Sequence, residues 1–494
     1  MPSLAIALTP GDGIGPEIMD ATLALFREAG VMEHLSFVPV EMGRGVFEKG
    51  NTRGMTDEAV RLTEECGVLF KGPMETPKGG GGKSINVTAR KLWNTFANLR
   101  QFKTLPGVET VYSRAGIHLD FSVVRENIED TYGGIEHRLS NDVVQCKRLA
   151  SAPGCDEVHR FAFHAARRLG VKKVHCGHKA NIMKMTDGLF LDRFRVAARD
   201  FPEIEAADVI VDALCMNLVM RPQQYQMIVL PNLQGDIVSD LCAGLVGGLG
   251  FAPSANIGNH ISIFEAVHGT APDIAGKGVA NPTSLVLSGI MMLRHVGLCR
   301  QASAIENALL ATLESGIRTG DFGDRARPPV GTGAFAEAIA SRLGEKPKTV
   351  PAVADGEEAC VSLVRPPRPS GPEVIRTFRN VVTHVVGCDL YLDTPLSPLS
   401  LAEEMSRVAQ DTPFLPTLIS NRGTQVWPTG SVYTECVDYY RVRFEPRDGV
   451  QPGTLGQSRT VALLDKVAEK FTVCSYELLR TFDGVRGYSL AQGQ

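Results

Sequence analysis

The chain has 494 residues, which is enough for about two to four compact domains with sizeable apolar cores. Hydrophobic residues make up 44% of it and charged residues 21%, a composition that is typical of globular proteins and excludes a disordered chain. The 51 basic and 55 acidic residues give a net charge of -4, so we expect no nucleic-acid partner and no general attraction to anionic membranes.

The amino terminus, the apolar segments and the cysteines together predict a cytoplasmic location. Residues 1–10 lack a basic region ahead of a long apolar run, which disfavours a signal peptide. The apolar stretch 241–252 is interrupted by glycines and is about half as long as the roughly 20 residues of a membrane-spanning helix. The 11 cysteines are scattered and include no Cys-x-x-Cys pair, so neither a disulfide framework nor a cysteine metal cluster is expected.

The first 345 residues alternate short apolar runs with helical patterns. In chain order they predict a strand at 4–8, helices at 16–29 and 58–65, and a strand at 68–70. Further strands are expected at 121–124, 171–176, 209–211 and 227–230, followed by helices at 288–296, 305–313 and 334–343. This order predicts the α/β class, with a mainly parallel sheet covered by helices.

The composition changes after residue 345. Six prolines between positions 345 and 372 predict a semi-rigid linker. Beyond it the patterns predict a strand at 381–392, a helix at 399–409, strands at 415–425 and 433–444, a helix at 460–471 and a last extended run. A βαββαβ order is typical of one small α+β domain. Such a domain could bind a small effector, extend a dimer contact or do neither, and we hypothesise a role in oligomerisation.

Two glycine-rich segments resemble nucleotide-binding motifs, and each departs from its motif at one residue. Gly11, Gly13 and Gly15 lie between a strand and a helix, but the third glycine of a dinucleotide-binding fingerprint would fall on Pro16. We expect Pro16 in the first turn of the helix, with the glycines forming a tight turn before it. Residues 79–84 end like a phosphate-binding loop, but its first glycine would fall on Pro77, so a phosphoryl-transfer protein stays a disfavoured alternative.

Charged residues farther along the chain suggest a site for a polyanion and a cation. Arg90, Arg100 and Arg125 could converge on carboxylates, because a planar guanidinium group binds a carboxylate through two hydrogen bonds. Asp236 and Asp240 are four positions apart, so on a helix they would share one face, as oxygen ligands of a hard cation would. Taken singly, such residues are more often surface charges, and only the joint pattern is specific.

Several motifs in order resemble the β-decarboxylating dehydrogenases, and specifically the isocitrate dehydrogenases. They lie at 10–16, 71–73, 84–90, 125–127, 134–137, 235–240 and 268–272, and the resemblance covers about the first 345 residues. The segment 420–425 also resembles the extra carboxy-terminal domain of a longer bacterial subgroup. The resemblance implies a two-domain fold that is not a Rossmann fold, with a large domain from 1–100 and 245–345, a small inserted dimerising domain from 101–244, a linker at 346–374 and an α+β domain at 375–494.

The resemblance also implies the reaction, namely oxidation of isocitrate to 2-oxoglutarate and CO₂ in the tricarboxylic acid cycle, with Mg²⁺ or Mn²⁺. Within the family a Ser-x-Asn sequence before the first arginine marks isocitrate, so Ser84 and Asn86 would contact the distal carboxylate of the substrate. Arg90, Arg100 and Arg125 would hold the other carboxylates. Homoisocitrate and isopropylmalate dehydrogenases share the arginines and stay alternatives.

The same resemblance assigns the proton transfers and the metal ligands. Lys179 would accept the proton of the substrate hydroxyl, directly or through water and Asp212, while Tyr132 would donate a proton to the enolate. Asp212, Asp236 and Asp240 would hold the metal ion. In the family the lysine and the aspartate that match Lys179 and Asp212 come from the second subunit, so a homodimer with shared active sites is expected.

The expected nicotinamide cofactor is NAD. The resemblance places it at Glu75, Thr76, His268, Gly269, Thr270, Ala271, Asp273, Ile274 and Asn281. NADP-using relatives have Lys-Tyr in place of Asp273 and Ile274, and a carboxylate accepts hydrogen bonds from a ribose 2′-OH but repels a 2′-phosphate. Gly320 and Asp324, which align with a Tyr and an Arg of NADP enzymes, agree with NAD, whereas Arg221 favours the NADP alternative because its position can touch a 2′-phosphate from the neighbouring subunit.

Overall fold

The computed structural model describes residues 4–75, 84–354, 381–431, 433–451 and 454–490. These residues form two compact units that are described separately below. The first unit combines the chain up to Gly133 with Arg148–Ser370, and the second combines Gly134–Lys147 with Gly371–Gln494. None of the described helices has both the length and the apolar character that crossing a bilayer requires.

The first unit is built on one ten-stranded sheet with the order β2-β1-β3-β12-β11-β4-β5-β10-β8-β9. The sheet is mainly parallel, as predicted, because only three neighbouring pairs, β12–β11, β11–β4 and β4–β5, are antiparallel. In chain order its strands are β1 Leu4–Thr9, β2 Leu35–Pro39, β3 Val68–Lys71, β4 Ala97–Lys103, β5 Asp120–Glu126, β8 Lys173–His178, β9 Glu205–Ile210, β10 Met227–Leu230, β11 Pro253–Ile257 and β12 Ser262–Ala266.

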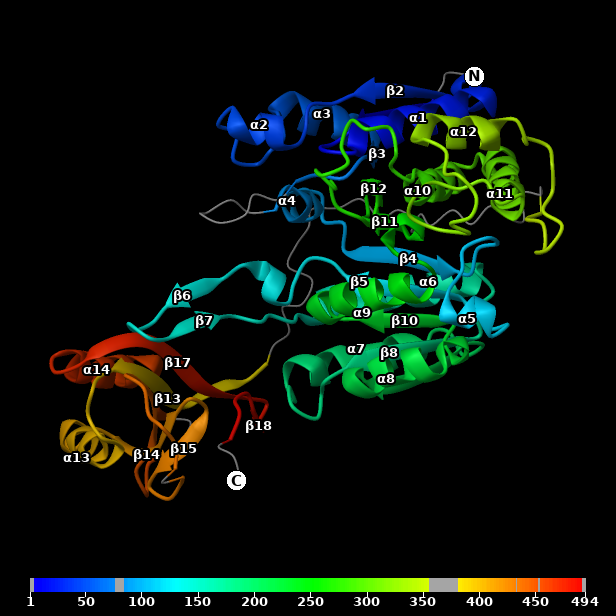
Figure 1. Cartoon of the computed structure of the whole chain (residues 1–494). Coiled ribbons are helices and arrows are strands. Elements are labelled where there is room, and N and C mark those ends of the chain that lie inside the picture. The colour runs from blue at the N-terminus through cyan, green and yellow to red at the C-terminus, as the bar shows by residue number, and fades with distance from the viewer. Residues whose placement is uncertain (1–3, 76–83, 355–380, 432, 452–453, 491–494) are drawn as a thin grey trace. The chain divides into compact units, whose positions relative to one another are not determined.

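Helices pack against this sheet both in its β2–β11 half and in its β4–β9 half (Figure 1). They are α1 Gly15–Glu28, α2 Arg44–Glu48, α3 Asp57–Cys66, α4 Ile85–Leu92, α5 Val111–Arg114, α6 Ala152–Arg168, α7 Thr186–Ala198, α8 Val211–Met220, α9 Asn232–Leu245, α10 Thr283–His295, α11 Cys299–Glu314 and α12 Thr332–Ala340. Phe26 of α1 stacks on Phe70 of β3, and Phe163 of α6 stacks on Phe194 of α7. The apolar helix faces therefore form the core against the sheet, as the helical periodicity predicts. The predicted strand at 209–211 begins four residues late and ends one residue late, because β9 begins at Glu205 and Val211 already begins α8.

The amino-terminal glycine turn packs against backbone. Pro16 lies in the first turn of α1, as predicted. The Asp12 amide donates to the Pro73 carbonyl at 2.7 Å, and the Ile14 amide donates to the Thr270 carbonyl at 2.9 Å. A Cβ atom on Gly13, where φ is +61°, would lie 2.1 Å from that Thr270 oxygen. The glycines thus allow three loops to meet, which a bulkier residue would prevent.

The second unit is an α+β domain, as predicted. Its six-stranded antiparallel sheet has the order β15-β14-β16-β13-β17-β18. Its elements are β13 Thr383–Asp393, α13 Pro398–Val408, β14 Phe414–Asn421, β15 Thr424–Trp427, β16 Tyr439–Pro446, α14 Gln457–Ala468, β17 Thr472–Phe482 and β18 Val485–Arg486. The single strand predicted at 415–425 is instead a hairpin, because Arg422 and Gly423 adopt left-handed φ values of 51° and 79° and reverse the chain between β14 and β15.

A short hairpin from the middle of the chain belongs to this second unit. It consists of β6 Glu136–Arg138 and β7 Val144–Cys146. Ser140 donates to Asp438 at 2.7 Å, and Lys147 forms an ion pair with Glu477 at 3.1 Å. The sequence prediction assigned these residues to the inserted segment 101–244. Most of the predicted linker, from residue 355 on, lies outside the described residues.

Candidate active site

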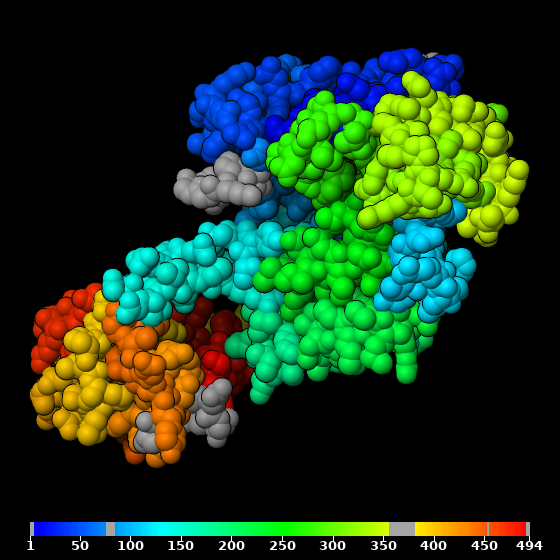
Figure 2. Space-filling model, in the orientation of Figure 1, coloured from blue at the N-terminus to red at the C-terminus, as the bar shows by residue number. Residues whose placement is uncertain are grey.

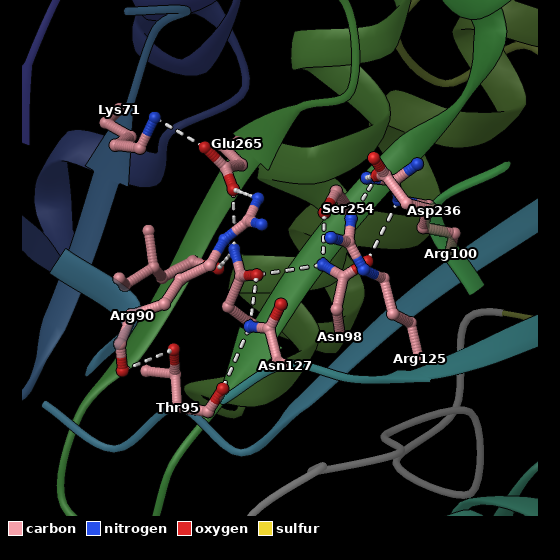
Figure 3. A network of polar contacts seen from close by, with 12 residues as sticks. Lys71, Arg90, Thr95, Asn98, Arg100, Arg125, Asn127, Asp236, Ser254 and Glu265 are labelled. Carbon is pink, nitrogen blue, oxygen red and sulfur yellow. Dashed lines mark hydrogen bonds and ion pairs between the residues drawn. The ribbon is translucent and has the colours of Figure 1, made fainter. Parts of the chain in front are cut away.

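Arg100 and Arg125 lie side by side in the middle of the large sheet, on β4 and β5 (Figure 3). Both side chains are almost fully buried. Arg125 donates to Asp236 on α9, and Arg100 Nη2 is 3.7 Å from the same carboxylate. Arg100 Nη1 is 3.2 Å from Asp240, which lies one helical turn beyond Asp236. The predicted helical face that carries both aspartates therefore exists and meets both arginines.

Arg90, on α4, completes the group of three predicted arginines. Its Nη2 donates to Glu265 on β12 at 2.9 Å, and Lys71 on β3 contacts the same carboxylate at 2.5 Å. Burial alone would raise the pKa of Glu265, but the charges of Lys71 and Arg90 lower it well below its usual range. Glu265 is therefore a buried anion that holds two cations in place.

The three arginines repel one another. Burial lowers the pKa of Arg125 to about 10, and the nearby charge of Arg90 contributes to this lowering. Burial and Arg90 likewise lower the pKa of Arg100. A site that buries several cations close together is stabilised when it binds an anion, because the anion offsets both the repulsion between the cations and their lost hydration. The cluster is thus suited to a ligand with several carboxylates.

The strand pattern explains why these groups share one face. On β4, Asn98 and Arg100 alternate with the apolar Ala97 and Leu99, so both polar side chains point to the same side of the sheet. The strand register aligns Arg100 with Ser254, and the next pairs along that row are Ser254 with Glu265 and Glu265 with Lys71. A second row aligns Arg125 with Asn98 and Asn98 with Asn256. These two rows of polar residues cross the centre of an otherwise apolar sheet.

The sequence prediction did not include several members of this network. They are Lys71, Asn98, Asn127, Asn232, Ser239, Ser254, Asn256 and Glu265. A signal was available, because polar and apolar residues alternate from Ala97 to Arg100 in β4 and along β11. That pattern indicates a buried polar face, although it does not say which strands are neighbours.

Tyr132 is in contact with one carboxylate of α9, that of Asp236. It lies in the short 3-10 turn Thr131–Gly133, and its hydroxyl donates to Asp236 Oδ2 at 2.5 Å. The guanidinium of Arg125 lies 4.8 Å from the centre of the Tyr132 ring. Burial and then the Asp236 hydrogen bond raise the pKa of Tyr132, so its phenol keeps its proton near neutral pH. Burial raises the pKa of Asp236, but Arg125 and the Tyr132 hydrogen bond lower it overall, so Asp236 is charged.

Lys179 and Asp212 contact each other, with 2.6 Å between Lys179 Nζ and Asp212 Oδ1. The hydrogen bond from Lys179 lowers the pKa of Asp212. Within the described part of the single chain, neither residue makes a hydrogen bond or ion pair with Asp236, Asp240 or Tyr132. No three His, Cys, Asp or Glu side chains among the described residues are arranged to hold a metal ion. One chain thus brings together two of the three predicted metal ligands.

A cleft of about 450 Å³ extends from the arginines to the loop after β12. Its lining includes Asn86, Arg90 and Arg100, together with His268 to Pro272. Figure 2 shows the surface hollowed between this loop and α9. Three buried polar atoms there have no hydrogen-bond partner among the described residues, namely Asn86 Oδ1, Arg90 Nε and His268 Nε2. Unpaired buried polar atoms are costly, so their position in a cleft indicates a polar ligand.

The predicted cofactor residues fall into three groups. Glu75, His268, Gly269, Thr270 and Ala271 line the cleft. Burial lowers the pKa of His268, so its ring is neutral, and its Nδ1 lies 3.0 Å from the Gly269 carbonyl. The second group is exposed or engaged elsewhere, and the third lies outside the described residues.

Asp273 and Ile274 are exposed beyond the cleft lining. The amide of Asn281 donates to Asp321 at 3.0 Å, while its oxygen accepts from the backbone amide of Thr283 at the start of α10. Thr76 lies outside the described residues. Ser84 immediately precedes α4, and its carbonyl accepts from the Thr88 amide at 2.9 Å.

Comparison with known proteins identifies the class of protein. A family model described as isocitrate/isopropylmalate dehydrogenase matches residues 5–339. The chain belongs to this family. A second model, described as the C-terminal domain of bacterial isocitrate dehydrogenase, matches residues 383–494. The predicted fold, including its additional α+β domain, is therefore confirmed.

Individual relatives cover nearly the whole chain. A protein named isocitrate dehydrogenase [NADP] from Thermus thermophilus is 44% identical over 99% of this chain and 96% of its own length. Its namesake from Rickettsia felis is 38% identical over 99% of both chains. The probable isocitrate dehydrogenase [NAD] subunit alpha of Drosophila melanogaster is 44% identical over 65% of this chain and 84% of its own.

Solved structures agree with the observed fold. A crystal structure of a Thermus thermophilus protein has a TM-score of 0.90 at 43% identity and covers 99% of this chain and 96% of its own. The structure of isocitrate dehydrogenase from Methylococcus capsulatus has a TM-score of 0.65 at 42% identity, and covers 69% of this chain and 99% of its own.

Proposed function

We propose that the protein oxidises and decarboxylates isocitrate to 2-oxoglutarate and CO₂, with a divalent metal ion and NAD. The observation that carries this proposal is that Arg100 and Arg125 contact the carboxylates of Asp240 and Asp236. Arg90, which Glu265 holds, lines the same cleft as Arg100. The arginines offset the charge of a tricarboxylic acid, and the aspartates offer hard oxygen ligands.

The chain's own residues bind and orient the substrate in this proposal. The three arginines hold two carboxylates, and Ser84 and Asn86 contact the third. In support, the unpartnered Asn86 oxygen lies in the lining of the cleft close to Arg90, where a ligand donor could reach it. A Ser84→Leu variant should lose isocitrate turnover relative to wild type. Faster turnover of isopropylmalate or homoisocitrate than of isocitrate by the wild-type chain would instead favour those acids.

Tyr132 supplies the proton that the enolate carbon receives after CO₂ leaves. Its raised pKa keeps the phenol protonated, and Arg125 beside its ring stabilises the phenolate that forms. A bound Mg²⁺ or Mn²⁺ would stabilise the enolate charge, and NAD would accept the hydride. Asp236 and Asp240 fit such a cation, because carboxylate oxygens are the ligands that Mg²⁺ and Mn²⁺ prefer.

We further propose that the active unit is a homodimer in which Lys179 and Asp212 act in the site of the partner. Two features support this. Lys179 and Asp212 do not reach the α9 carboxylates of their own chain. In addition, α8 and α9 expose a set of apolar side chains, the α8–α9 apolar face, which consists of Met216, Val219, Met220, Leu233 and Ile237. Exposed apolar patches of this kind are typical of subunit interfaces. The α+β domain is proposed to add to the oligomer contact.

The preference for NAD rests on the loop position of Asp273. Its carboxylate would repel the 2′-phosphate of NADP and accept a hydrogen bond from the 2′-OH of NAD. Two of the relatives named above carry NADP in their names and one carries NAD, so the name of a relative does not decide the cofactor. NADP use is the alternative to be tested.

Initial rates with isocitrate and Mn²⁺, compared between NAD and NADP, test the proposed reaction and the proposed preference for NAD. We expect kcat/KM to be higher with NAD. The double variant Asp273→Lys/Ile274→Tyr should shift the preference toward NADP. A wild-type chain that uses NADP better would contradict the NAD assignment alone, whereas no turnover of isocitrate with either cofactor would contradict the reaction. ATP hydrolysis by the purified chain would favour the phosphoryl-transfer alternative, whose glycine run lies mostly outside the described residues.

A further inference from the structure

Two asparagines, Asn98 and Asn256, link the arginines of the site through the middle of the sheet. Figure 3 labels Asn98 in this network. Arg100 Nε donates to Asn98 Oδ1 at 2.9 Å, and Asn98 Nδ2 donates to Asn256 Oδ1 at 2.9 Å. Asn256 Nδ2 in turn donates to Glu265 Oε1 at 2.7 Å, and Arg90 donates to the same oxygen at 2.9 Å. An unbroken row of hydrogen bonds therefore joins Arg100 to Arg90.

The two ends of this row dictate its direction. A guanidinium group can only donate, and a carboxylate can only accept. Asn98 must therefore turn its oxygen toward Arg100 and its nitrogen toward Asn256. Asn256 must then turn its own nitrogen toward Glu265. Reversal of either amide would bring two donors or two acceptors face to face.

Both amides are buried and fully used. Asn98 and Asn256 are each 0% exposed. The second N–H of Asn98 donates to Ser254 Oγ at 2.7 Å, and Asn256 Oδ1 also accepts from Asn127 at 3.0 Å. Disruption of one amide leaves several buried partners unsatisfied, so each orientation is strongly held.

The position of Arg100 shows what the row contributes. Its Nη1 is anchored by Ser239 at 2.6 Å and by Asp240 at 3.2 Å, both on α9. A guanidinium held only at that nitrogen could still tilt. The contact between its Nε and Asn98 fixes the plane of the group from the sheet side. At the other end of the row, Glu265 accepts a hydrogen bond from Arg90 and so fixes the orientation of that guanidinium group.

We propose that Asn98 and Asn256 are positioning residues that fix Arg90 and Arg100 relative to each other, and so set the spacing of the cations that select a tricarboxylic acid. The inference rests on the proposed function, because it assumes that these arginines bind the substrate. It predicts that loss of the row weakens substrate binding and leaves cofactor binding largely intact.

The test compares Asn256→Ala and Asn98→Ala with a matched control in the full-length protein. Asn307 is a suitable control, because it is buried on α11 and its amide exchanges two hydrogen bonds with the backbone of Val353 away from the site, at 3.0 and 2.8 Å. With isocitrate and Mn²⁺, we expect roughly tenfold higher KM for isocitrate in either site variant. The KM for the nicotinamide cofactor should stay within about twofold, and Asn307→Ala should leave both KM values unchanged.

Equal increases in the two KM values, or a KM for isocitrate that changes no more than in Asn307→Ala, would overturn the proposal. If Asn256→Ala does not fold, Asn98→Ala makes the same test, because it breaks the row at another link. A ligand-free crystal structure of either variant gives a readout independent of the substrate. Displaced guanidinium groups are expected, and unchanged positions of Arg90 and Arg100 would overturn the proposal. A wild-type chain inactive on isocitrate would overturn the proposed reaction alone.

Discussion

Glu126 follows Arg125 on β5, and the alternation of the strand directs its side chain away from the arginine cluster. Its carboxylate accepts from the backbone amides of Ile128 and Glu129, at 2.8 and 3.1 Å. Burial raises the pKa of Glu126 to about 7, with smaller contributions from Glu129 and Asp130, and the two amides only partly oppose this rise. The folded protein therefore holds a carboxyl group that resists ionisation.

This residue should make stability depend on pH. The folded pKa of about 7 exceeds the ordinary value of 4.5, so the unfolded chain loses this proton first as the pH rises. Stability therefore falls between about pH 4.5 and pH 7 and levels off above, by on the order of 3 kcal/mol at most. Glu126→Gln should raise Tm relative to wild type more at pH 8 than at pH 5. The exposed Glu64→Gln is the control, and an equal Tm difference at both pH values would refute the expectation.

Helix α9 approaches the sheet closely because it has glycine at one position. A Cβ on Gly235 would lie 2.8 Å from Arg125 Cγ and 2.9 Å from Arg125 Cβ. Glycine in a helix normally costs about 1 kcal/mol relative to alanine, so Gly235→Ala would be stabilising if space were available. Here it should displace Arg125 and so raise the KM for isocitrate roughly tenfold.

Gly244→Ala is the matched control on the same helix, because apart from its chain neighbours and the backbone of its own helix, no described residue has an atom within 4 Å of the position of the added Cβ. Steady-state kinetics and thermal melting of the two variants make the comparison. If Gly235→Ala behaves like Gly244→Ala, the close approach of α9 is not what positions Arg125.

At the scale of the whole molecule, the decisive question is whether one active site draws on two chains. Lys179→Ala and Asp236→Asn should each inactivate the enzyme. In a mixed dimer, however, one site would combine the intact Asp236 of one chain with the intact Lys179 of the other. Co-expression of the two variants in equal amounts should therefore restore about one quarter of wild-type activity, since half of the dimers are mixed and each has one intact site.

A control separates this outcome from general stabilisation. Lys179→Ala mixed with Asp212→Asn should restore nothing, because both residues are predicted to come from the same chain in every site. Mass analysis of the purified mixture verifies that mixed dimers form. If mixed dimers of the first pair form but are inactive, the shared site is contradicted. The exposed α8–α9 apolar face would then still indicate a subunit interface.

Much of the molecule could be anticipated from local pattern. Most of the elements that the strand and helix periods predicted correspond to observed ones, although α6, α7, β4, β11 and β12 were not among them. The four-residue spacing of Asp236 and Asp240 predicted their common helical face. A different kind of error occurred where backbone conformation changes over one or two residues. The left-handed Arg422 and Gly423 are an example, since an arginine at such a position carries no strong turn signal.

The sequence predicted the three arginines as a set, but it did not predict the residues that hold them in place. Glu265 lies 175 positions from Arg90, and Asn256 lies 158 positions from Asn98. Their contacts depend on β11 and β12 entering the sheet between β3 and β4. No spacing along the chain encodes that order. The same holds for the glycine turn that resembles a dinucleotide-binding fingerprint. Gly11 and Gly13 pack against backbone atoms of two distant loops, which the local sequence could not identify.

The amino-acid sequence by itself determined the class of elements, their order, and which residue types are available for chemistry, because periodicity and side-chain chemistry are local properties. Only the tertiary structure decided which of those residues meet. Strand order and register bring Lys71, Arg90 and Glu265 together and leave Lys179 and Asp212 apart from the α9 carboxylates. The physical reason is that buried charges must find partners across the sheet, and the neighbours of a strand are set by the packing of the whole fold rather than by adjacent residues.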